Sequence, residues 1–288
     1  MYGMILIFSL CFLCFSESID FKVVDLTHTI SPSTIYWPGS PEYNFTILNR
    51  ENISGHWFES NFIGTAEHGG THLDAPAHFN KGKWRTHSIP VENLVGSGVI
   101  IDVKSKAALN PDYKVAIDDL KQWEIMYGRI PDRAVVFMNS GWHERYPNAT
   151  LVFNSDDPAN PTTYHFPSWH EDTISWLISE RSVVIVGVDT PSVDEGQSTI
   201  FPVHTLLGAA DICGAENVAN LDMVPNSGSV IVVAVMKIFD GSGGPARIIA
   251  TVPREGESSG LNTYSWLLLI VIFLISIMII LKRLSMHS

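Results

Sequence analysis

The sequence predicts a single α/β domain, and three observations point to that class. Short runs rich in β-branched residues recur through the middle of the chain, bounded by Gly, Pro, Asn or Asp, as strands are. One run, Val183-Val184-Ile185-Val186, is apolar throughout, which is typical of a strand buried on both faces of a sheet. Segments with apolar residues at helical spacing alternate with these runs, and that order favours helices packed on a buried sheet.

The individual elements follow from the same patterns. The expected strands cover residues 21–26, 98–103, 134–138, 183–188, 230–236 and 248–252. Two helices are expected between them, because apolar residues recur at helical spacing in 116–127 and in 170–179. A third, short helix is expected to begin near Pro202 and to run through Leu207, since Pro is favoured in a first helical turn. Residues 158–167 are expected to form a loop.

The composition supports one sizeable folded domain and excludes one class of partner. Of the 288 residues, 18 are basic and 30 are acidic, so the chain carries a formal net charge of −12. No run of five or more Lys or Arg residues occurs, which together with the acidic balance argues against a nucleic-acid-binding surface. Residues 17–257, between two apolar ends, are enough to bury a core as one domain.

Both ends of the chain carry apolar blocks that predict membrane targeting. Residues 1–16 resemble a secretory signal peptide, and a buried N-terminal strand is the alternative. Residues 264–281 are uncharged and long enough to cross a bilayer as a helix, with Trp266 near one interface and Lys282 at the other. A lipid-anchor signal after Gly260 is the alternative to a transmembrane helix.

These ends predict a single-pass membrane protein whose domain is extracellular or luminal, with a short cytoplasmic tail, residues 282–288. Three glycosylation acceptors, at Asn44, Asn52 and Asn148, agree with that location. Cys213 is the one cysteine of the domain, so no disulfide can form within it, and the core or a metal must hold the fold. We expect this thiol to be buried and inert rather than a nucleophile.

The chemistry is expected in a histidine-rich segment, residues 68–78, whose sequence is HGGTHLDAPAH. Its glycines and its proline exclude a helix. In an extended chain every interval between His68, His72, Asp74 and His78 is even, so all four side chains would face one side. Imidazole nitrogens and carboxylate oxygens are ligands that Zn²⁺ and Mn²⁺ take, so the segment predicts a metal site. Spacing alone does not say which of the four bind metal, although His78, after a proline, is the natural candidate for a free base.

The longer run from His68 to Phe79, HGGTHLDAPAHF, resembles the signature of the cyclase-like metal-dependent hydrolases. That family includes bacterial-type kynurenine formamidases and isatin hydrolases. Other segments similar to the family are WPG at 37–39, VDTPSVD at 188–194, and PVH at 202–204 with Glu216 following. The resemblance runs from about Val24 to Val252. It implies a swivelling β/β/α-type architecture for the single domain, here followed by the C-terminal transmembrane helix.

The resemblance implies a role for each matching residue. The family's metal ligands fall on His68, His72, Asp74, His204 and Glu216. Its proton-transferring histidine falls on His78, and the aromatic residue that lines its substrate pocket falls on Trp37. It also implies Zn²⁺ as the cofactor, in two copies, with a single Mn²⁺ as the alternative, and it implies a homodimer.

We therefore expect metal-dependent hydrolysis of a C–N amide bond in a small molecule. Aryl formamides such as N-formylkynurenine are the leading substrates, and a cyclic amide or lactone such as isatin is the alternative. Asn139-Ser140 stand where bacterial formamidases more often have Arg-Thr, so a cationic pocket group is expected to be missing. A non-catalytic cell-surface binding module with a structural metal is the alternative from another class, against which a free base at His78 argues. Asp189 and Asp194 are expected to be structural turn residues.

Overall fold

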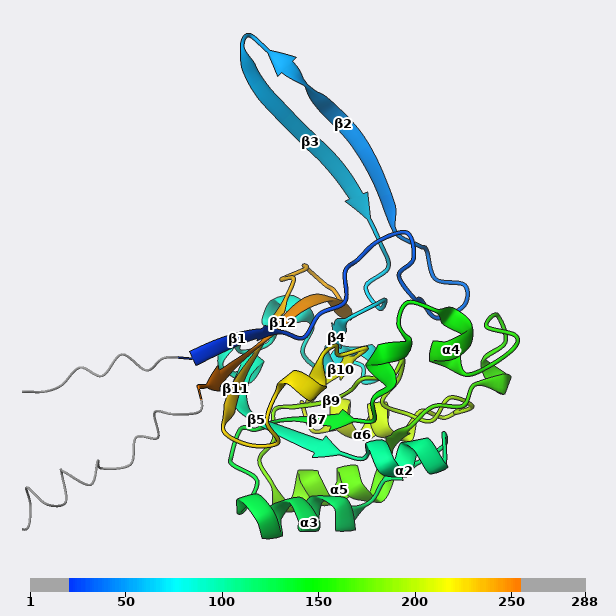
Figure 1. Ribbon diagram of the computed structural model, residues 1–288, viewed down its shortest axis with the longest axis vertical. Coiled ribbons are helices and arrows are strands. Elements are labelled where there is room, and N and C mark those ends of the chain that lie inside the picture. The colour runs from blue at the N-terminus through cyan, green and yellow to red at the C-terminus, as the bar shows by residue number, and fades with distance from the viewer. Residues whose placement is uncertain (1–20, 255–288) are drawn as a thin grey trace, which may run out of the picture. The chain divides into compact units, whose positions relative to one another are not determined.

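A computed structural model of the protein describes residues 21–254, and the main sheet within them closes into a barrel (Figure 1). The strands of this sheet are β1 (Phe21–Asp25), β4 (His72–Asp74), β5 (Val95–Asp102), β7 (Val135–Asn139), β9 (Ile185–Val188), β10 (Cys213–Glu216), β11 (Ser229–Val235) and β12 (Gly243–Pro253). Their order is β1-β12-β11-β5-β7-β9-β10-β4, and β4 pairs again with β12. Seven strands therefore form a closed ring, with β1 added at the side of β12.

The helices of the described residues are α2 (Lys104–Leu109), α3 (Ile117–Tyr127), α4 (Ala149–Phe153), α5 (Glu171–Glu180) and α6 (Pro202–Ala209). The helices α3 and α5 lie side by side against β5, β7 and β9 (Figure 1). Leu120 and Trp123 of α3, with Ile174 and Leu177 of α5, bury one face of these strands in a common cluster. The apolar spacing seen in the sequence thus becomes the helix face that packs on the sheet.

The opposite face of the same strands fills the interior of the barrel. Successive side chains of a strand point to opposite sides, so Ile100 belongs to the interior cluster while its neighbours Val99 and Ile101 pack beneath the helices. Phe137 and Ile248 meet Ile100 in that interior cluster. The continuous apolar runs arise because both faces of these strands are covered.

Two further two-stranded sheets lie outside the barrel in the described residues. The strands β6 (Lys114–Val115) and β8 (Ser168–Trp169) form a short parallel pair. The strands β2 (Asn44–Ile53) and β3 (His56–Gly64) form an antiparallel hairpin that projects away from the barrel (Figure 1). We call this hairpin, residues 44–64, the arm.

The α/β class and every expected strand and helix are confirmed, with ends shifted by a few residues. The swivelling β/β/α-type architecture is wrong, because the sheet is a closed seven-stranded barrel in a mixed α/β domain. Closure depends on β4, where Asp74 lies opposite Gly214 of β10 on one side and Gly243 of β12 on the other. Such pairings join segments far apart in the chain, so no local pattern reveals them.

The expected single-pass membrane protein also needs correction. Within residues 21–254, no helix is long and apolar enough to cross a membrane. The segments on which that expectation rested, 1–16, 264–281 and 282–288, lie outside the described residues. The acceptors Asn44, Asn52 and Asn148 are exposed in the structure, but nothing tests their glycosylation, which stays a prediction, as do the domain limits 17 and 257.

Candidate metal centre

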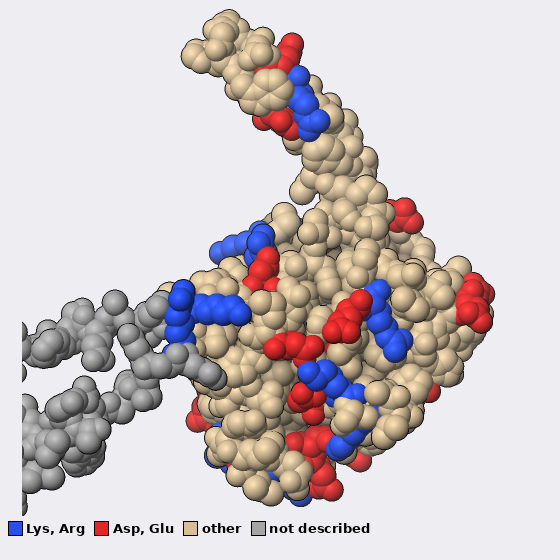
Figure 2. Space-filling view, in the orientation of Figure 1, with Lys and Arg blue, Asp and Glu red and all other residues tan. Residues whose placement is uncertain are grey.

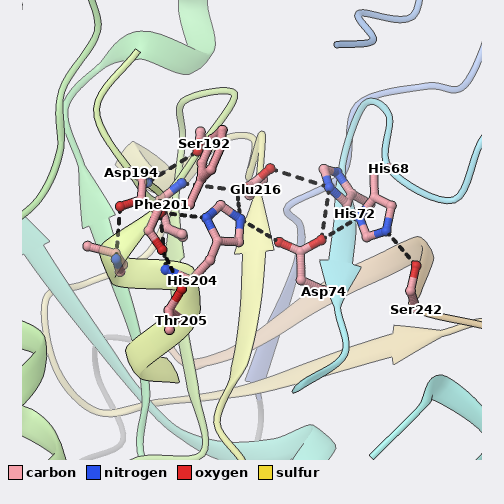
Figure 3. A network of polar contacts seen from close by, with 12 residues as sticks. His68, His72, Asp74, Ser192, Asp194, Phe201, His204, Thr205, Glu216 and Ser242 are labelled. Atoms are coloured by element: carbon pink, nitrogen blue, oxygen red, sulfur yellow. Dashed lines mark hydrogen bonds and ion pairs between the residues drawn. The ribbon is translucent and has the colours of Figure 1, made fainter. Parts of the chain in front are cut away.

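Four buried polar side chains face one another at one end of the barrel (Figure 3). His72 and Asp74 come from β4, His204 from α6, and Glu216 from β10. These four residues are between 3% and 9% exposed. The strand register brings two of them together, because His72 lies directly opposite Glu216 in the antiparallel pair of β4 and β10. The sequence therefore assembles this group from segments more than 100 residues apart.

The facing atoms are spaced as the ligands of one ion would be. The Nε2 atom of His72 lies 3.3 Å from Asp74 Oδ1 and 3.4 Å from Glu216 Oε2. The Nε2 atom of His204 lies 3.3 Å from Asp74 Oδ2 and 3.2 Å from Glu216 Oε1. Ligands about 2.0–2.1 Å from a tetrahedral ion are about 3.3 Å from one another. The spacing matches that value.

Hydrogen bonds on the far side of each ring decide which nitrogen faces the carboxylates. His72 Nδ1 donates to the carbonyl oxygen of Gly70 at 2.9 Å, and His204 Nδ1 donates to Asp194 Oδ2 at 2.7 Å. Each Nε2 therefore presents a lone pair to carboxylate oxygens, which also only accept. His72 Nε2 and Asp74 Oδ2 are buried without a hydrogen-bond partner. Acceptors that face acceptors need either protons or a metal ion between them, and these residue types and spacings fit a metal ion.

The charge distribution of the centre agrees with that fit. Burial opposes the charged form of His72, but the carboxylates of Asp74 and Glu216 outweigh burial and raise the pKa of His72 to about 9. Burial opposes the charged form of His204 too, but its hydrogen bonds to the carboxylates of Asp194, Asp74 and Glu216 outweigh burial and raise its pKa well above the usual value. The site is thus a buried, strongly negative environment that favours positive charge.

His68 and His78 lie beside this group and share Asp74 with it. His68 Nδ1 is 2.6 Å from Asp74 Oδ1, and its Nε2 is 3.0 Å from the hydroxyl of Ser242. The ring of His78 stacks on that of His68, with centroids 3.8 Å apart and planes 17° from parallel. Burial lowers the pKa of His78 to about 4. Asp74 therefore belongs to two clusters of possible ligands, one with His72 and Glu216 and one with His68 and His78.

The histidine-rich segment is not extended throughout. Only residues 72–74 form a strand, while Gly70 takes a positive φ of 56° and residues 76–78 form a 3₁₀ turn. The expectation that one extended chain places all four side chains on the same side is therefore wrong for the ends of the segment. His68 and His78 reach the same pocket as His72 by turns of the backbone.

A pocket of about 280 Å³ opens above the centre, and one side of its wall is aromatic. It is lined by His68, His72, His78, His204 and Glu216 on the polar side and by Tyr36, Trp37, Phe79, Phe153 and Phe201 on the apolar side. Trp37 contacts Phe153 and Tyr164 edge to face, with centroids 6.2 and 5.3 Å away. Among the described residues that line the pocket, none is Lys or Arg.

Several residues near the pocket have roles that the sequence did not reveal. Asp194, expected to be structural, accepts hydrogen bonds from the backbone N–H groups of Val203 and His204 as well as from the His204 ring (Figure 3). Asp194 therefore accepts hydrogen bonds from the first turn of α6 and also orients the ring of a candidate ligand, His204. Phe201 is held at a φ of 46°, just before α6, and its ring lines the pocket. The one signal for Asp194 in the sequence was an acidic residue ten positions before His204.

Other candidates are structural, as expected. Asp189 accepts hydrogen bonds from the backbone and hydroxyl of Ser140 and from the backbone of Trp142. Asn139 donates to Asp222 at 2.9 Å. Neither Asn139 nor Ser140 lines the pocket. Cys213 is buried and free, and burial raises the pKa of its thiol, so it is a poor nucleophile.

A buried group of two histidines and two carboxylates beneath an aromatic pocket is an arrangement typical of metal-dependent hydrolases. The chain belongs to the cyclase family, since the family model described as putative cyclase matches residues 24–195. It is 30% identical to isatin hydrolase from Roseibium aggregatum over 82% of this chain and 93% of that protein. It is 26% identical to kynurenine formamidase from Salinibacter ruber over 79% of this chain and 96% of that protein.

A solved structure agrees with these relatives. The crystal structure of an isatin hydrolase bound to the product analogue thioisatinate superposes with a TM-score of 0.75 and 29% identity, covering 88% of this chain and all of that one. The expected family and the expected metal-dependent hydrolase are therefore confirmed. Hydrolase relatives that span almost the whole domain argue against the non-catalytic binding module.

Proposed function

We propose that the protein hydrolyses the C–N bond of an aromatic amide, with a metal centre built from His72, Asp74, His204 and Glu216. The single observation that carries this proposal is the buried set of facing acceptor atoms beneath an aromatic pocket. The names of the isatin hydrolase and kynurenine formamidase relatives support the same reaction class, because both substrates are aromatic and contain an amide bond.

We further propose that the centre holds two Zn²⁺ ions, with a single Mn²⁺ as the alternative. His72, His204 and Glu216 would hold one ion together with Asp74. Asp74 would also serve a second ion held with His68, because both residues belong to one cluster whose donor atoms lie within 4.8 Å of one another. When bound, such ions supply a Lewis acid that activates water and polarises an amide carbonyl.

The protein's own residues supply the remaining steps. His78 lies in the pocket wall, where it takes a proton from the attacking water and returns it to the leaving nitrogen as the C–N bond breaks. Water thus contributes its hydroxyl to the acyl carbon and its proton to the amine. Trp37 and the other aromatic rings of the wall hold a planar substrate and exclude bulk water from the reacting bond.

The pocket lining bears on the choice between two substrates. N-formylkynurenine carries an amino-acid group whose carboxylate needs a cationic or hydrogen-bonding partner, whereas isatin is an uncharged bicyclic amide. No Lys or Arg is among the described residues that line the pocket, so that carboxylate would find no cationic side chain there. We therefore favour an uncharged cyclic amide such as isatin as the substrate, with aryl formamides as the second candidate on the strength of the kynurenine formamidase relatives.

The test combines metal analysis with a substrate panel. Purified protein loaded separately with Zn²⁺ or Mn²⁺ is assayed for bound metal per chain and for hydrolysis of isatin, simple aryl formamides and N-formylkynurenine. We expect bound metal and hydrolysis of isatin and of uncharged formamides at higher kcat/KM than N-formylkynurenine. His72→Ala should abolish both bound metal and hydrolysis, whereas His165→Ala, in an exposed position, should change neither. A fully loaded protein that turns over no amide would refute the proposal.

A further inference from the structure

Asn217 follows directly after the candidate ligand Glu216 and lines the pocket, although the reaction described above gives it no part. Its residue is buried, and its backbone has a positive φ of 49°, a left-handed conformation that Asn tolerates better than most residues. Its backbone N–H donates to the carbonyl oxygen of Thr190 at 2.9 Å. The backbone therefore holds the side chain of Asn217 at the end of β10, beside the candidate metal centre.

The side chain of Asn217 contacts the group that orients His72. Its Nδ2 atom donates to the carbonyl oxygen of Gly70 at 3.1 Å, and His72 Nδ1 donates to the same oxygen at 2.9 Å. A carbonyl oxygen has two lone pairs, so it accepts both bonds at once. Asn217 thus fixes the direction of the carbonyl that decides which nitrogen of His72 faces the carboxylates.

A second hydrogen bond joins the same two segments where their strand pairing ends. The last paired residues of β4 and β10 are His72 and Glu216. One position further on, the hydroxyl of Thr71 donates to the backbone carbonyl of Asn217 at 2.6 Å. The two side-chain bonds, one from each segment, therefore continue the connection between β4 and β10 beyond the ladder.

Asn220 shows what an Asn of this kind does for the fold alone. It also has a left-handed backbone, with a φ of 54°, and its Nδ2 atom donates to the carbonyl oxygen of Asp25 at 2.8 Å. Asn220 is exposed, however, and it does not line the pocket. Asn217 differs because the carbonyl that it holds also holds a candidate metal ligand.

We propose that Asn217 is a positioning residue of the metal centre. It orients His72 through the carbonyl of Gly70, and it keeps the ends of β4 and β10 together so that His72 Nε2 and Glu216 Oε2 stay 3.4 Å apart. The proposal rests on the metal centre of the proposed function. Loss of a group that orients a ligand lowers metal affinity by about 10- to 100-fold, which gives the expected size of the effect.

The experiment measures Zn²⁺ affinity, by competition with a chromogenic chelator, for the wild type, Asn217→Gly and the matched control Asn220→Gly. Glycine accepts a positive φ, so each substitution removes the amide without straining the backbone. Each also exchanges one uncharged residue for another. The net charge of −12 and the acidic groups on the surface in Figure 2 stay as they are, so long-range attraction of the cation is equal in all three proteins.

We expect Asn217→Gly to bind Zn²⁺ about 10- to 100-fold more weakly than the wild type, and excess Zn²⁺ to restore its kcat. Asn220→Gly should bind Zn²⁺ as the wild type does, and the Tm of each metal-free variant shows what the substitution costs the fold itself. Wild-type affinity in Asn217→Gly, or an equal loss in both variants, would overturn the positioning role alone. A wild type that binds no Zn²⁺ and no Mn²⁺ would overturn the metal centre as well.

A second pair of variants applies the same test if Asn217→Gly does not fold. Thr71→Val removes the hydroxyl that donates to the carbonyl of Asn217, whereas Thr71→Ser keeps it. We expect weaker Zn²⁺ binding in Thr71→Val and wild-type binding in Thr71→Ser. Equal affinity in these two variants would contradict the proposal, because the connection between the strand ends would then have no effect on the ligands.

Discussion

His72 and His204 face the same two carboxylates, but different groups hold their rings. A backbone carbonyl, that of Gly70, fixes His72, whereas the carboxylate of Asp194 fixes His204. His78 differs from both, because its contacts are with other rings: it stacks on His68 and lies edge to face with His204 at 5.7 Å. Two histidines are thus oriented as ligands and one is left beside them to carry a proton, which makes their roles separable by mutation.

The first prediction concerns His78. His78→Ala should leave the metal content near that of the wild type while kcat falls by about 10² to 10⁴, the usual contribution of a general acid–base. The comparison is His72→Ala, in which metal and activity should be lost together because a ligand is removed. Metal analysis of each variant beside its steady-state kinetics separates the two roles. Loss of metal from His78→Ala equal to that from His72→Ala would make His78 a ligand instead.

The second prediction concerns Asp194 as a positioning residue. Asp194→Asn should weaken metal affinity by about 10- to 100-fold, because loss of the ionised acceptor frees the ring of His204 to turn. Excess metal should restore kcat, which damage to the fold would not allow. Asp189→Asn is the matched control, a buried strand-end Asp that holds Ser140 and Trp142 instead of a candidate ligand. If both variants lose stability alike and neither is rescued by metal, Asp194 is merely structural.

At the scale of elements, the sequence predicts those helices and strands whose apolar residues form a regular local pattern. Helices α3 and α5 and the strands β5, β7 and β9 were predictable because each buries its own apolar run. The strand β4 is only three residues long, so no periodicity marks it. The sequence analysis does not predict the arm, although the pair Ser54-Gly55 is a signal for it. Both residues have positive φ, of 51° and 85°, as a tight hairpin turn requires.

The residues of the candidate centre also fall into two groups, those that a local pattern reveals and those that it does not. His68, His72, Asp74 and His78 were visible as a local cluster, because the chemistry of a metal site needs those residue types close together. His204 and Glu216 came only from family resemblance, since their place beside Asp74 depends on pairing between β10 and β4 and on the position of α6. The orientation of His204 by Asp194 depends on a loop conformation that no spacing rule describes.

The third prediction concerns the tie between α3 and α5. Glu124 accepts two hydrogen bonds from the guanidinium of Arg181, at 2.7 and 2.6 Å, and one from the backbone of Ile130. The bonds from Arg181 lower the pKa of Glu124 below its usual value. A depressed pKa means that the ionised form stabilises the fold above the unfolded-state pKa, and that this stabilisation is lost as the pH falls through the folded-state pKa.

Glu124→Gln should therefore lower the free energy of unfolding by about 1 kcal/mol at neutral pH. The difference between variant and wild type should shrink as the pH is lowered and vanish once Glu124 is protonated in the folded protein. Urea unfolding over a pH series measures both quantities. Glu180→Gln, an exposed residue at the end of α5, removes the same charge without this tie and should have little effect. A pH-independent loss in Glu124→Gln would contradict the assigned cause.

At the scale of the whole molecule, the metal centre lies where the barrel closes. β4 completes the ring between β10 and β12, and the candidate ligands on β4, α6 and β10 bring together segments that begin at residues 72, 202 and 213. The one described cysteine, Cys213, is free, so no disulfide in residues 21–254 crosslinks these segments. Four buried polar groups at this seam oppose folding unless a cation compensates them. A bound ion should therefore stabilise the whole barrel as well as support the reaction.

The last prediction follows from that position. An ion that binds only the folded chain stabilises it by about 2.7 kcal/mol when its free concentration is 100 times its Kd. For a domain of this size, such a change shifts Tm by roughly 5–10 °C. Removal of metal with a chelator should lower the Tm of the wild type by that amount, and added Zn²⁺ should restore it. The chelator should leave the Tm of His72→Ala unchanged, because that variant already lacks the ion. A wild type that melts at the same temperature with and without chelator would show that the four facing side chains hold no ion that the fold depends on, and would require protons on His72 and His204 to balance the carboxylates instead.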